Sequence, residues 1–335
     1  MFARRSWLIA FLAMAAPGLN AQPSAGYYDS ALGKTGVVLR SALHNVIKGH
    51  TVIPYSSSVS VDVVDALSAL DEDPLNTNNV ILIYTRRSEA KTNFNVTGGW
   101  NREHLWPNSY GIDSRGPAYS DLHHLRPEDE NVNSARGNKF FDLSNTNDVN
   151  YRRPGHAEAP FTSTDTDSWE PPDAVKGDIA RAMFYVDVRY EGERTNELDL
   201  MLTDRTPLIT SITNLMGRLT TLLRWHLRDP VDAAELRRND VVDRRFQHNR
   251  NPFVDHPEWV ESLWTGTYPS FVATRIGGQL RVSWSTNEAN ATLERSAGFP
   301  ANWLPVAIAP QRLSGEFVLQ MGLMNTMGFF RLRVP

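Results

Sequence analysis

The sequence predicts an α+β fold, with a mainly helical domain over residues 22–267 and a small antiparallel all-β domain over residues 268–335. Apolar residues recur at helical spacing in several stretches before residue 250. After residue 270, short segments alternate apolar and polar residues and are separated by glycine-containing turns. A length of 335 residues suits one large and one small domain, and 41% apolar residues are enough to bury a core.

The first half of the large domain mixes helices and strands. Helical spacing predicts helices between residues 22 and 75, and a short apolar run predicts a buried strand at Asn79–Tyr84. A second strand is expected to end near His104, and after a long loop a third spans Asp121–Leu125. A helix is expected from about Pro127, because proline followed by acidic residues is typical of a helix start.

The second half of the large domain is expected to be helical. Residues 144–171 have the composition of a loop. Helical stripes of apolar residues then begin after Pro172 and recur over Ile212–Leu227 and Ala233–Phe246.

Residues 1–21 have the pattern of a cleaved secretory signal. Arg4 and Arg5 precede the apolar run Trp7–Ala16, and Ala21 supplies a small residue at the expected cleavage point. The alternative is a membrane anchor, but the run is shorter than the roughly 20 apolar residues that span a bilayer. We therefore expect an exported protein, periplasmic or secreted, with no membrane span after signal removal.

Charge and cysteine content limit the chemistry. The net charge of −4 counts mildly against a nucleic-acid partner, although a local basic groove and a bound cation can suffice. The chain has no cysteine, so disulfides and thiolate zinc sites are excluded. Any metal must be held by histidine, carboxylate, amide or water.

Three polar strings carry the chemistry. They are Trp100–Pro107, Asp121–Pro127 and Asn131–Asn138. Hydrolysis of a phosphodiester needs a base for water and positive charge near the phosphate, and neutral histidine is a suitable base near neutral pH. Mg²⁺ prefers oxygen ligands from one or two side chains, which a glutamate and an asparagine can supply.

The three strings resemble the bacterial endonuclease I family, whose active site is a ββα-metal (His-Me finger) motif. Two downstream strings, Gly177–Arg181 and Asn249–Pro257, resemble the family's next helix and closing segment, so the resemblance covers about residues 25–265. It implies an endonuclease that cuts DNA, with RNA left open, with little sequence preference and with 5′-phosphate products. It implies nucleic acid as the partner and Mg²⁺, or another divalent ion such as Mn²⁺ or Ca²⁺, as the cofactor. No protein partner can be inferred.

The resemblance also implies roles for individual residues. His104 matches the general base, and Glu103 and Asn133 match the metal ligands. Adjacent residues of a strand point to opposite faces, so Glu103 and His104 can serve one site only where the strand ends or bulges.

Other residues of the strings are candidates for supporting roles. Arg102, Arg115 and Arg136 are expected to contact phosphate, and Arg115 is the candidate for the family's arginine beside the scissile phosphate. Asp121 or His123 is expected to orient His104 or a metal-bound water.

Two other interpretations stay open at this stage. One is a zinc hydrolase that uses His104, His123 and His124. The other is an exported nucleic-acid-binding or surface-attachment protein whose nuclease site is inactive. The terminal β module could serve attachment, sorting or substrate binding, and its sequence carries no catalytic signature.

Overall fold

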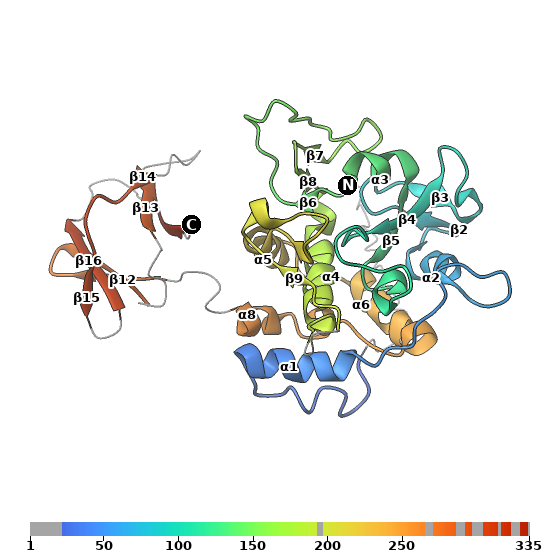
Figure 1. Cartoon of the computed structure of the whole chain (residues 1–335), viewed down its shortest axis with the longest axis horizontal. Coiled ribbons are helices and arrows are strands. Elements are labelled where there is room, and N and C mark those ends of the chain that lie inside the picture. The colour runs from blue at the N-terminus through green and yellow to red at the C-terminus, as the bar shows by residue number, and fades with distance from the viewer. Residues whose placement is uncertain are drawn as a thin grey trace, which may run out of the picture. The chain divides into compact units, whose positions relative to one another are not determined.

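The chain forms two compact units, Met1–Leu263 and Trp264–Pro335, in a computed structural model (Figure 1). The structure describes residues 22–192, 197–264, 271–285, 292–296, 304–313, 316–322 and 329–333. The expected signal, residues 1–21, lies outside the described residues. The fold class is confirmed, because a mixed helical and strand unit is followed by a β-rich one.

The first unit combines helices with several short sheets. Its helices are α1 (Gly36–Ile47), α2 (Val63–Leu70), α3 (Glu130–Arg136), α4 (Lys176–Arg189), α5 (Leu219–Arg228), α6 (Ala233–Val241), α7 (Pro252–Asp255) and α8 (Glu258–Trp264), the last ending at the unit boundary. Its strands are β1 (Glu72–Asp73), β2 (Asn76–Ile81), β3 (Ser88–Ala90), β4 (Trp100–His104), β5 (Leu125–Asp129), β6 (Phe140–Phe141), β7 (Ser163–Thr164), β8 (Ser168–Glu170), β9 (Met201–Leu202) and β10 (Leu215–Met216). They pair in the orders β1-β2-β3, β4-β5, β6-β8-β7 and β10-β9.

A hairpin and a helix form the centre of the polar region. Strands β4 and β5 pair antiparallel, from Trp100 opposite Asp129 to His104 opposite Leu125, and α3 follows directly. The expected strand at Asp121–Leu125 is therefore wrong in its bounds, as is the expected helix start at Pro127. Residues 121–124 form a turn, in which the Asp121 carboxylate accepts a hydrogen bond from the His123 amide.

Pro127 is compatible with β5 because of the side on which its backbone faces. Its carbonyl accepts a hydrogen bond from the Ile83 amide, so it points away from β4. In an antiparallel strand the nitrogen of a residue points to the same side as its carbonyl. The missing N–H of Pro127 is thus not needed by the ladder, and the strand continues to Asp129.

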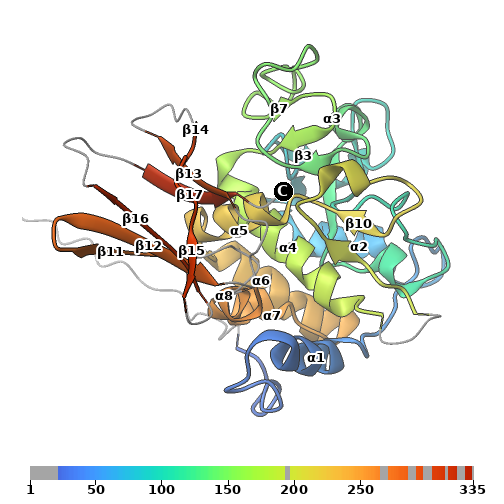
Figure 2. The ribbon, with the colours of Figure 1, turned by 60° about the vertical axis from the view of Figure 1, so that its left-hand side comes forward.

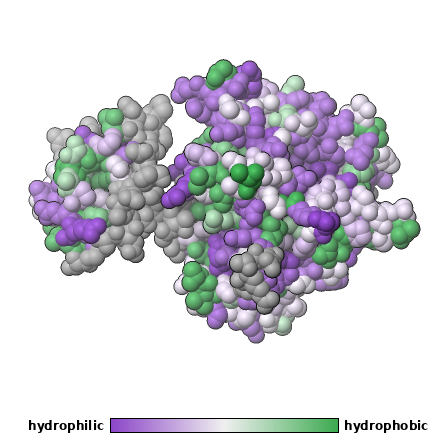
Figure 3. All heavy atoms as spheres, viewed as in Figure 1, coloured by the Kyte–Doolittle hydropathy of each residue, from purple (hydrophilic) through white to green (hydrophobic). Residues whose placement is uncertain are grey.

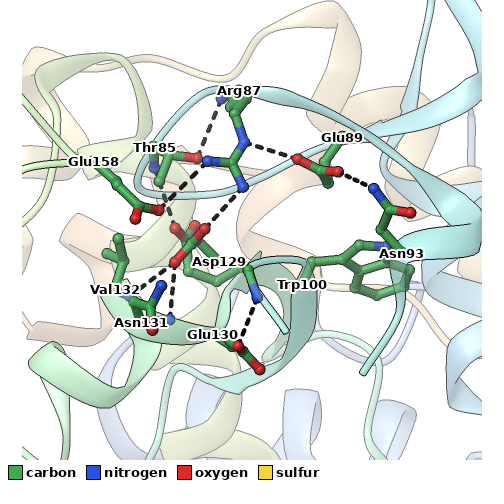
Figure 4. A network of polar contacts seen from close by, with 12 residues as sticks. Thr85, Arg87, Glu89, Asn93, Trp100, Asp129, Glu130, Asn131, Val132 and Glu158 are labelled. Carbon is green, nitrogen blue, oxygen red and sulfur yellow. Dashed lines mark hydrogen bonds and ion pairs between the residues drawn. The ribbon is translucent and has the colours of Figure 1, made fainter. Parts of the chain in front are cut away.

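Asp129, rather than Pro127, starts α3. Its carboxylate accepts hydrogen bonds from the amides of Asn131 and Val132 at 2.8 and 3.1 Å, and such an N-cap is worth about 1 kcal/mol. Figure 4 shows that Arg87 holds the same carboxylate at 2.8 Å and also pairs with Glu89 and Glu158. This network fixes the first turn of α3 against the β2–β3 hairpin.

Helix α4 runs through the middle of the first unit (Figures 1 and 2). Nearly all its residues from Gly177 to Arg189 are buried, and it packs against α1, α5 and α7. Because buried charges require partners, Arg181 of α4 forms a two-bond ion pair with Glu235, and Asp187 pairs with Arg40. The helix therefore serves as a polar scaffold as well as an apolar core.

Two other segments differ from expectation. Only the second part of Ile212–Leu227 is helical, because α5 begins at Leu219 and residues 215–216 pair with β9; Ile212 itself is 92% exposed. Residues 144–171 are not all loop, since β7 and β8 lie there and join β6 in a sheet. Strands of two or three residues are too short to show an alternating pattern.

The second unit is an antiparallel β module. Its strands are β11 (Phe271–Ile276), β12 (Gln279–Ser285), β13 (Thr292–Ser296), β14 (Leu304–Pro305), β15 (Gln311–Leu313), β16 (Glu316–Gly322) and β17 (Phe329–Arg333). They form two sheets, in the orders β11-β12-β16-β15 and β14-β13-β17. A small core includes Val282, Trp284, Leu293, Leu319 and Met321.

The surface of the first unit is mostly polar on the face that Figure 3 shows. Hydrophilic residues predominate there, and apolar ones occur in separate small groups. Within the described ranges, each helix is too short or too polar to cross a bilayer.

Candidate active site

The geometry of His104 makes it a base with a defined free nitrogen. It is the last residue of β4, and its Nε2 lies 2.9 Å from the carbonyl oxygen of Tyr119. A carbonyl oxygen can only accept, so Nε2 carries the hydrogen and donates it. In the neutral ring the lone pair then resides on Nδ1, which no described residue engages and which is not fully enclosed.

The surroundings of His104 keep it neutral. Burial, together with the positive charge His124 would carry when protonated, lowers the pKa of His104 from 6.5 to about 3. Its ring stacks on Tyr55 at 5.7 Å and lies 5.1 Å from the Tyr119 ring, measured between centroids. The imidazole is therefore held in one orientation and is unprotonated at neutral pH.

Glu103 is a buried carboxylate with one oxygen engaged and one free. Its Oε1 accepts hydrogen bonds from the Tyr84 hydroxyl at 2.6 Å and from Arg136 at 3.0 Å. No described residue donates to Oε2. Burial raises the pKa of Glu103, while Arg136 and Tyr84 oppose that rise.

Arg136 joins the neighbours Glu103 and His104, although their side chains have different partners. The pairing of β4 with β5 is regular up to His104, so no bulge turns the two side chains to one face. The strand does end at His104, as expected. The guanidinium of Arg136 donates to the Glu103 carboxylate at 3.0 Å and to the carbonyls of His104 and Leu105 at 2.9 and 2.7 Å.

The position of Arg136 differs from the predicted phosphate contact. The residue is 1% exposed and also lies over the Phe141 ring, 4.7 Å from its centroid. Its charge is already neutralised by Glu103, and two of its nitrogens are committed to three protein acceptors. Arg136 therefore holds the end of β4 and faces no open surface.

Asn133 presents an amide oxygen beside the same strand. It lies on α3, and its Nδ2 donates to Asn101 Oδ1 at 2.6 Å and to the Arg102 carbonyl at 3.3 Å. These bonds fix which end of the amide faces outward, because Oδ1 receives no hydrogen bond from the described residues.

The donor set suits a hard divalent cation. Glu103 Oε2 and Asn133 Oδ1 are two unengaged oxygens, and neither is among the described polar atoms that are both enclosed and unbonded. Mg²⁺ is commonly held by one or two such oxygens plus water. The residues present therefore fit the metal that the sequence suggested.

The other two candidate arginines lie at the surface. Arg102 is half-buried, its guanidinium 3.6 Å from the Tyr55 ring centroid and bonded to Ser56 at 3.0 Å and to the Tyr55 carbonyl. Arg115 is 89% exposed and pairs with Asp113 at 3.0 Å. Phosphate contact by either residue stays a prediction.

Asp121 and His123 lie away from His104, contrary to the expected orienting role. Asp121 accepts hydrogen bonds from Tyr185 and Tyr190, at 2.9 and 2.7 Å. His123 Nε2 faces the Asn249 carbonyl at 3.3 Å. Both residues connect the 121–124 turn to neighbouring segments, because a buried polar group takes the nearest partner available.

The groups that do contact the candidate site have weak sequence signals. Tyr84 lies in an apolar run that is typical of a core, and the Tyr119 carbonyl is a backbone group with no sequence signature. His124, whose ring centroid lies 5.5 Å from that of His104, is suggested by the sequence only as a zinc ligand.

The zinc interpretation finds no support in the geometry. Nε2 of His104, His123 and His124 each face a different backbone carbonyl, those of Tyr119, Asn249 and Ala118. Among the residues that the structure describes, no three histidine or acidic side chains form a metal-binding group.

Comparison with known proteins agrees with this site. The family description "Endonuclease I" matches residues 35–258. An extracellular ribonuclease of Bacillus subtilis (strain 168) is 47% identical over 256 residues, covering 76% of this chain and 83% of that protein. An extracellular ribonuclease of Bacillus amyloliquefaciens is 48% identical over 241 residues, covering 71% and 78%.

The fold, the site and these likenesses define a nuclease, an enzyme that cleaves nucleic acid. The chain belongs to the endonuclease I family. The resemblance inferred from the three polar strings is thereby confirmed.

Proposed function

We propose that this protein is an exported, divalent-metal-dependent endonuclease that hydrolyses phosphodiesters of RNA and DNA with little sequence preference. One observation carries the proposal: the Nε2–H of His104 is fixed on the Tyr119 carbonyl, so Nδ1 is a neutral base at the end of the strand that carries Glu103. The export signal pattern and the two extracellular relatives support export.

The chain's own groups account for the proton and for the positioning. His104 Nδ1 accepts a proton from the water whose oxygen attacks phosphorus, and the bond from phosphorus to the 3′ oxygen breaks. Glu103 and Asn133 would hold one Mg²⁺, which when bound supplies positive charge for the phosphate oxygens and the leaving oxygen. Arg136 and Tyr84 act as positioning residues, since both hold Glu103 through Oε1 and leave Oε2 for the metal.

The substrate range follows from the nucleophile. Water activated by histidine requires no 2′-hydroxyl, so the same site serves either sugar. The relatives named extracellular ribonuclease support RNA as a substrate. Arg102 and Arg115 are the proposed phosphate contacts, because their guanidinium groups lie at the surface.

The test is cleavage by the mature chain, residues 22–335, with Mg²⁺ and then with EDTA. We expect His104→Ala to lose about 10²-fold to 10⁴-fold in single-turnover rate, the usual worth of a general base. His156→Ala, a change at a histidine outside the site, serves as the matched control. Retention of near wild-type cleavage by His104→Ala would refute the assigned base.

Analysis of the product ends separates two chemistries. Hydrolysis by water predicts 5′-phosphate ends on both RNA and DNA. Attack by the RNA 2′-hydroxyl would instead give 2′,3′-cyclic phosphate and 5′-hydroxyl ends and would leave DNA intact. Binding without cutting across several divalent ions would favour the alternative of a nucleic-acid-binding or attachment protein.

A further inference from the structure

A second concave region lies outside the candidate active site. A cavity of about 460 Å³ is bordered by the turn at Arg86, the segment Arg153–Ser163 and the start of α4. Its volume is within the range of small-ligand sites. None of its lining residues belongs to the catalytic or metal-binding set described above.

Two arginines on its wall are available to a ligand. The side chains of Arg86 and Arg153 are exposed and make no hydrogen bond or ion pair with the described residues. The neighbouring Arg87 is different, because it is paired with three carboxylates (Figure 4). An unpaired guanidinium presents a fork of donors that fits a phosphate group.

The acidic residues of the cavity are already paired. Lys176 lies 2.7 Å from Glu170 and 2.6 Å from Asp173, so these three side chains form one ion-paired group. The unpaired charge left for a ligand is therefore that of Arg86 and Arg153. In a protein with a net charge of −4, this is a local positive site.

An exposed aromatic ring completes the wall. Phe161 is 71% exposed, and no other phenylalanine whose side chain the structure describes is comparably open. The turn that carries it is closed on itself: Gly155 donates to the Thr162 carbonyl at 3.1 Å, and Thr162 donates to the Ala159 carbonyl at 3.2 Å. The ring is thus displayed on an ordered turn, which costs free energy unless a ligand covers it.

The cavity is linked to the active site through Tyr84. Arg86 lies two residues after Tyr84, whose hydroxyl binds Glu103. The Tyr84 ring packs against Trp169 at 5.5 Å between centroids, and Trp169 lies on β8 beside Glu170 of the cavity wall. Two residues span about 7 Å, so a strand cut at Glu103 and His104 would pass the cavity within a few nucleotides.

We propose that this cavity is a subsite for single-stranded nucleic acid. One unpaired base stacks on Phe161, and the phosphates on either side of it pair with Arg86 and Arg153. Stacking on an aromatic ring is tolerant of sequence but requires a base that is free of its complement. The inference rests on the proposed function and adds a preference for single strands over duplexes.

Binding in EDTA tests the subsite without any cleavage. The mature chain is titrated into fluorescently labelled oligodeoxythymidine and oligouridine, with anisotropy as the readout. Phe161→Ala should weaken binding about 5-fold to 100-fold, the effect of losing one stacked base, whereas Phe161→Trp should retain it. A wild-type affinity for the duplex form equal to that for the single strand would overturn the proposal.

The arginines have a matched control in the same segment. Arg153→Ala should reduce the slope of log affinity against log salt by about 1, as expected for one lost phosphate contact. Arg152→Ala removes the same charge next door, but the Arg152 guanidinium bonds to the Tyr151 carbonyl and does not line the cavity, so its slope should stay. An equal loss in both variants would assign the effect to the charge of the loop and overturn the proposal.

The two proposals can fail separately. Cleavage of a dinucleotide, too short to reach the cavity, should be the same for Phe161→Ala and wild type. If Phe161→Ala and wild type bind the long oligonucleotides equally while wild type still cuts, the subsite is refuted and the nuclease stands. If Phe161→Trp loses as much binding as Phe161→Ala, the turn rather than the ring is responsible and the subsite is refuted too.

Discussion

Glu103 and Asp121 are two buried carboxylates in the same unit that accept hydrogen bonds from tyrosines, yet they are satisfied to different degrees. Asp121 uses both oxygens: Oδ2 accepts from Tyr185 and Tyr190, and Oδ1 accepts from the His123 amide and Gln247. Glu103 has partners on Oε1 alone among the described residues. One carboxylate is complete within the protein, and the other leaves an acceptor for a ligand.

The pKa directions follow this difference. Burial acts to raise the pKa of both groups. For Asp121 the nearby histidines and the Gln247 hydrogen bond outweigh burial and hold its pKa well below the usual range. For Glu103 burial outweighs Arg136 and Tyr84, and the pKa rises. A buried carboxylate that the protein does not fully stabilise is a candidate functional group, whereas a saturated one is a structural hub.

Replacing Glu103 by glutamine should give the largest effect on activity. The substituted amide keeps an oxygen for Tyr84 and Arg136 but loses the charge that would hold Mg²⁺, so we expect a rate loss of about 10³-fold. Because a buried charge is removed, the melting temperature in EDTA should stay equal or rise. Single-turnover cleavage and thermal unfolding measure the two effects.

The same variant tests the metal itself. Mg²⁺ should raise the melting temperature of the wild type, because a ligand that binds only the folded state stabilises it, and this rise should vanish in Glu103→Gln. Glu261→Gln, on the exposed side of α8, is the charge-matched control. An equal Mg²⁺-induced rise in both variants would remove Glu103 from the metal site.

Replacing Asp121 by asparagine should have the opposite profile. Four donors lose a charged acceptor, and we expect a loss of roughly 3 kcal/mol in the free energy of unfolding. For a unit of this size that lowers the melting temperature by roughly 6–12 °C. The Mg²⁺-induced rise should persist, since Asp121 makes no contact with the proposed ligands. Loss of metal binding without loss of stability would reverse the comparison.

The sequence predicted the candidate groups better than their partners. His104, Glu103 and Asn133 stood out because each belongs to a polar string that is costly to bury without a function. Asp121 belongs to such a string as well, and only the structure shows that tyrosines from α4 and its C-terminal end satisfy it. These partners lie more than 60 residues away, so no local pattern could identify them.

The fold showed the same division. Long periodic segments such as α4 were predicted, because a helical stripe of apolar residues extends over several turns. The bounds of β5 and α3 were not, because they depend on which side the Pro127 backbone faces and on the Asp129 cap. Roles carried by backbone atoms, such as the Tyr119 carbonyl that orients His104, leave no trace in residue type.

The pH dependence of the Asp121→Asn penalty gives the smallest and most specific test. Because the folded-state pKa of Asp121 lies below its unfolded value of 3.8, its stabilisation is fully present above that value and is lost as pH falls toward the folded pKa. The difference in unfolding free energy between wild type and Asp121→Asn should therefore be constant from pH 8 to about pH 5 and should shrink only below about pH 4. Urea unfolding at several pH values measures it. A penalty that already shrinks between pH 7 and pH 5 would mean that the partner histidines, rather than the carboxylate, titrate in that range. Asp121 would then depend on protonated histidines, whereas His123 is neutral here because burial lowers its pKa to about 3.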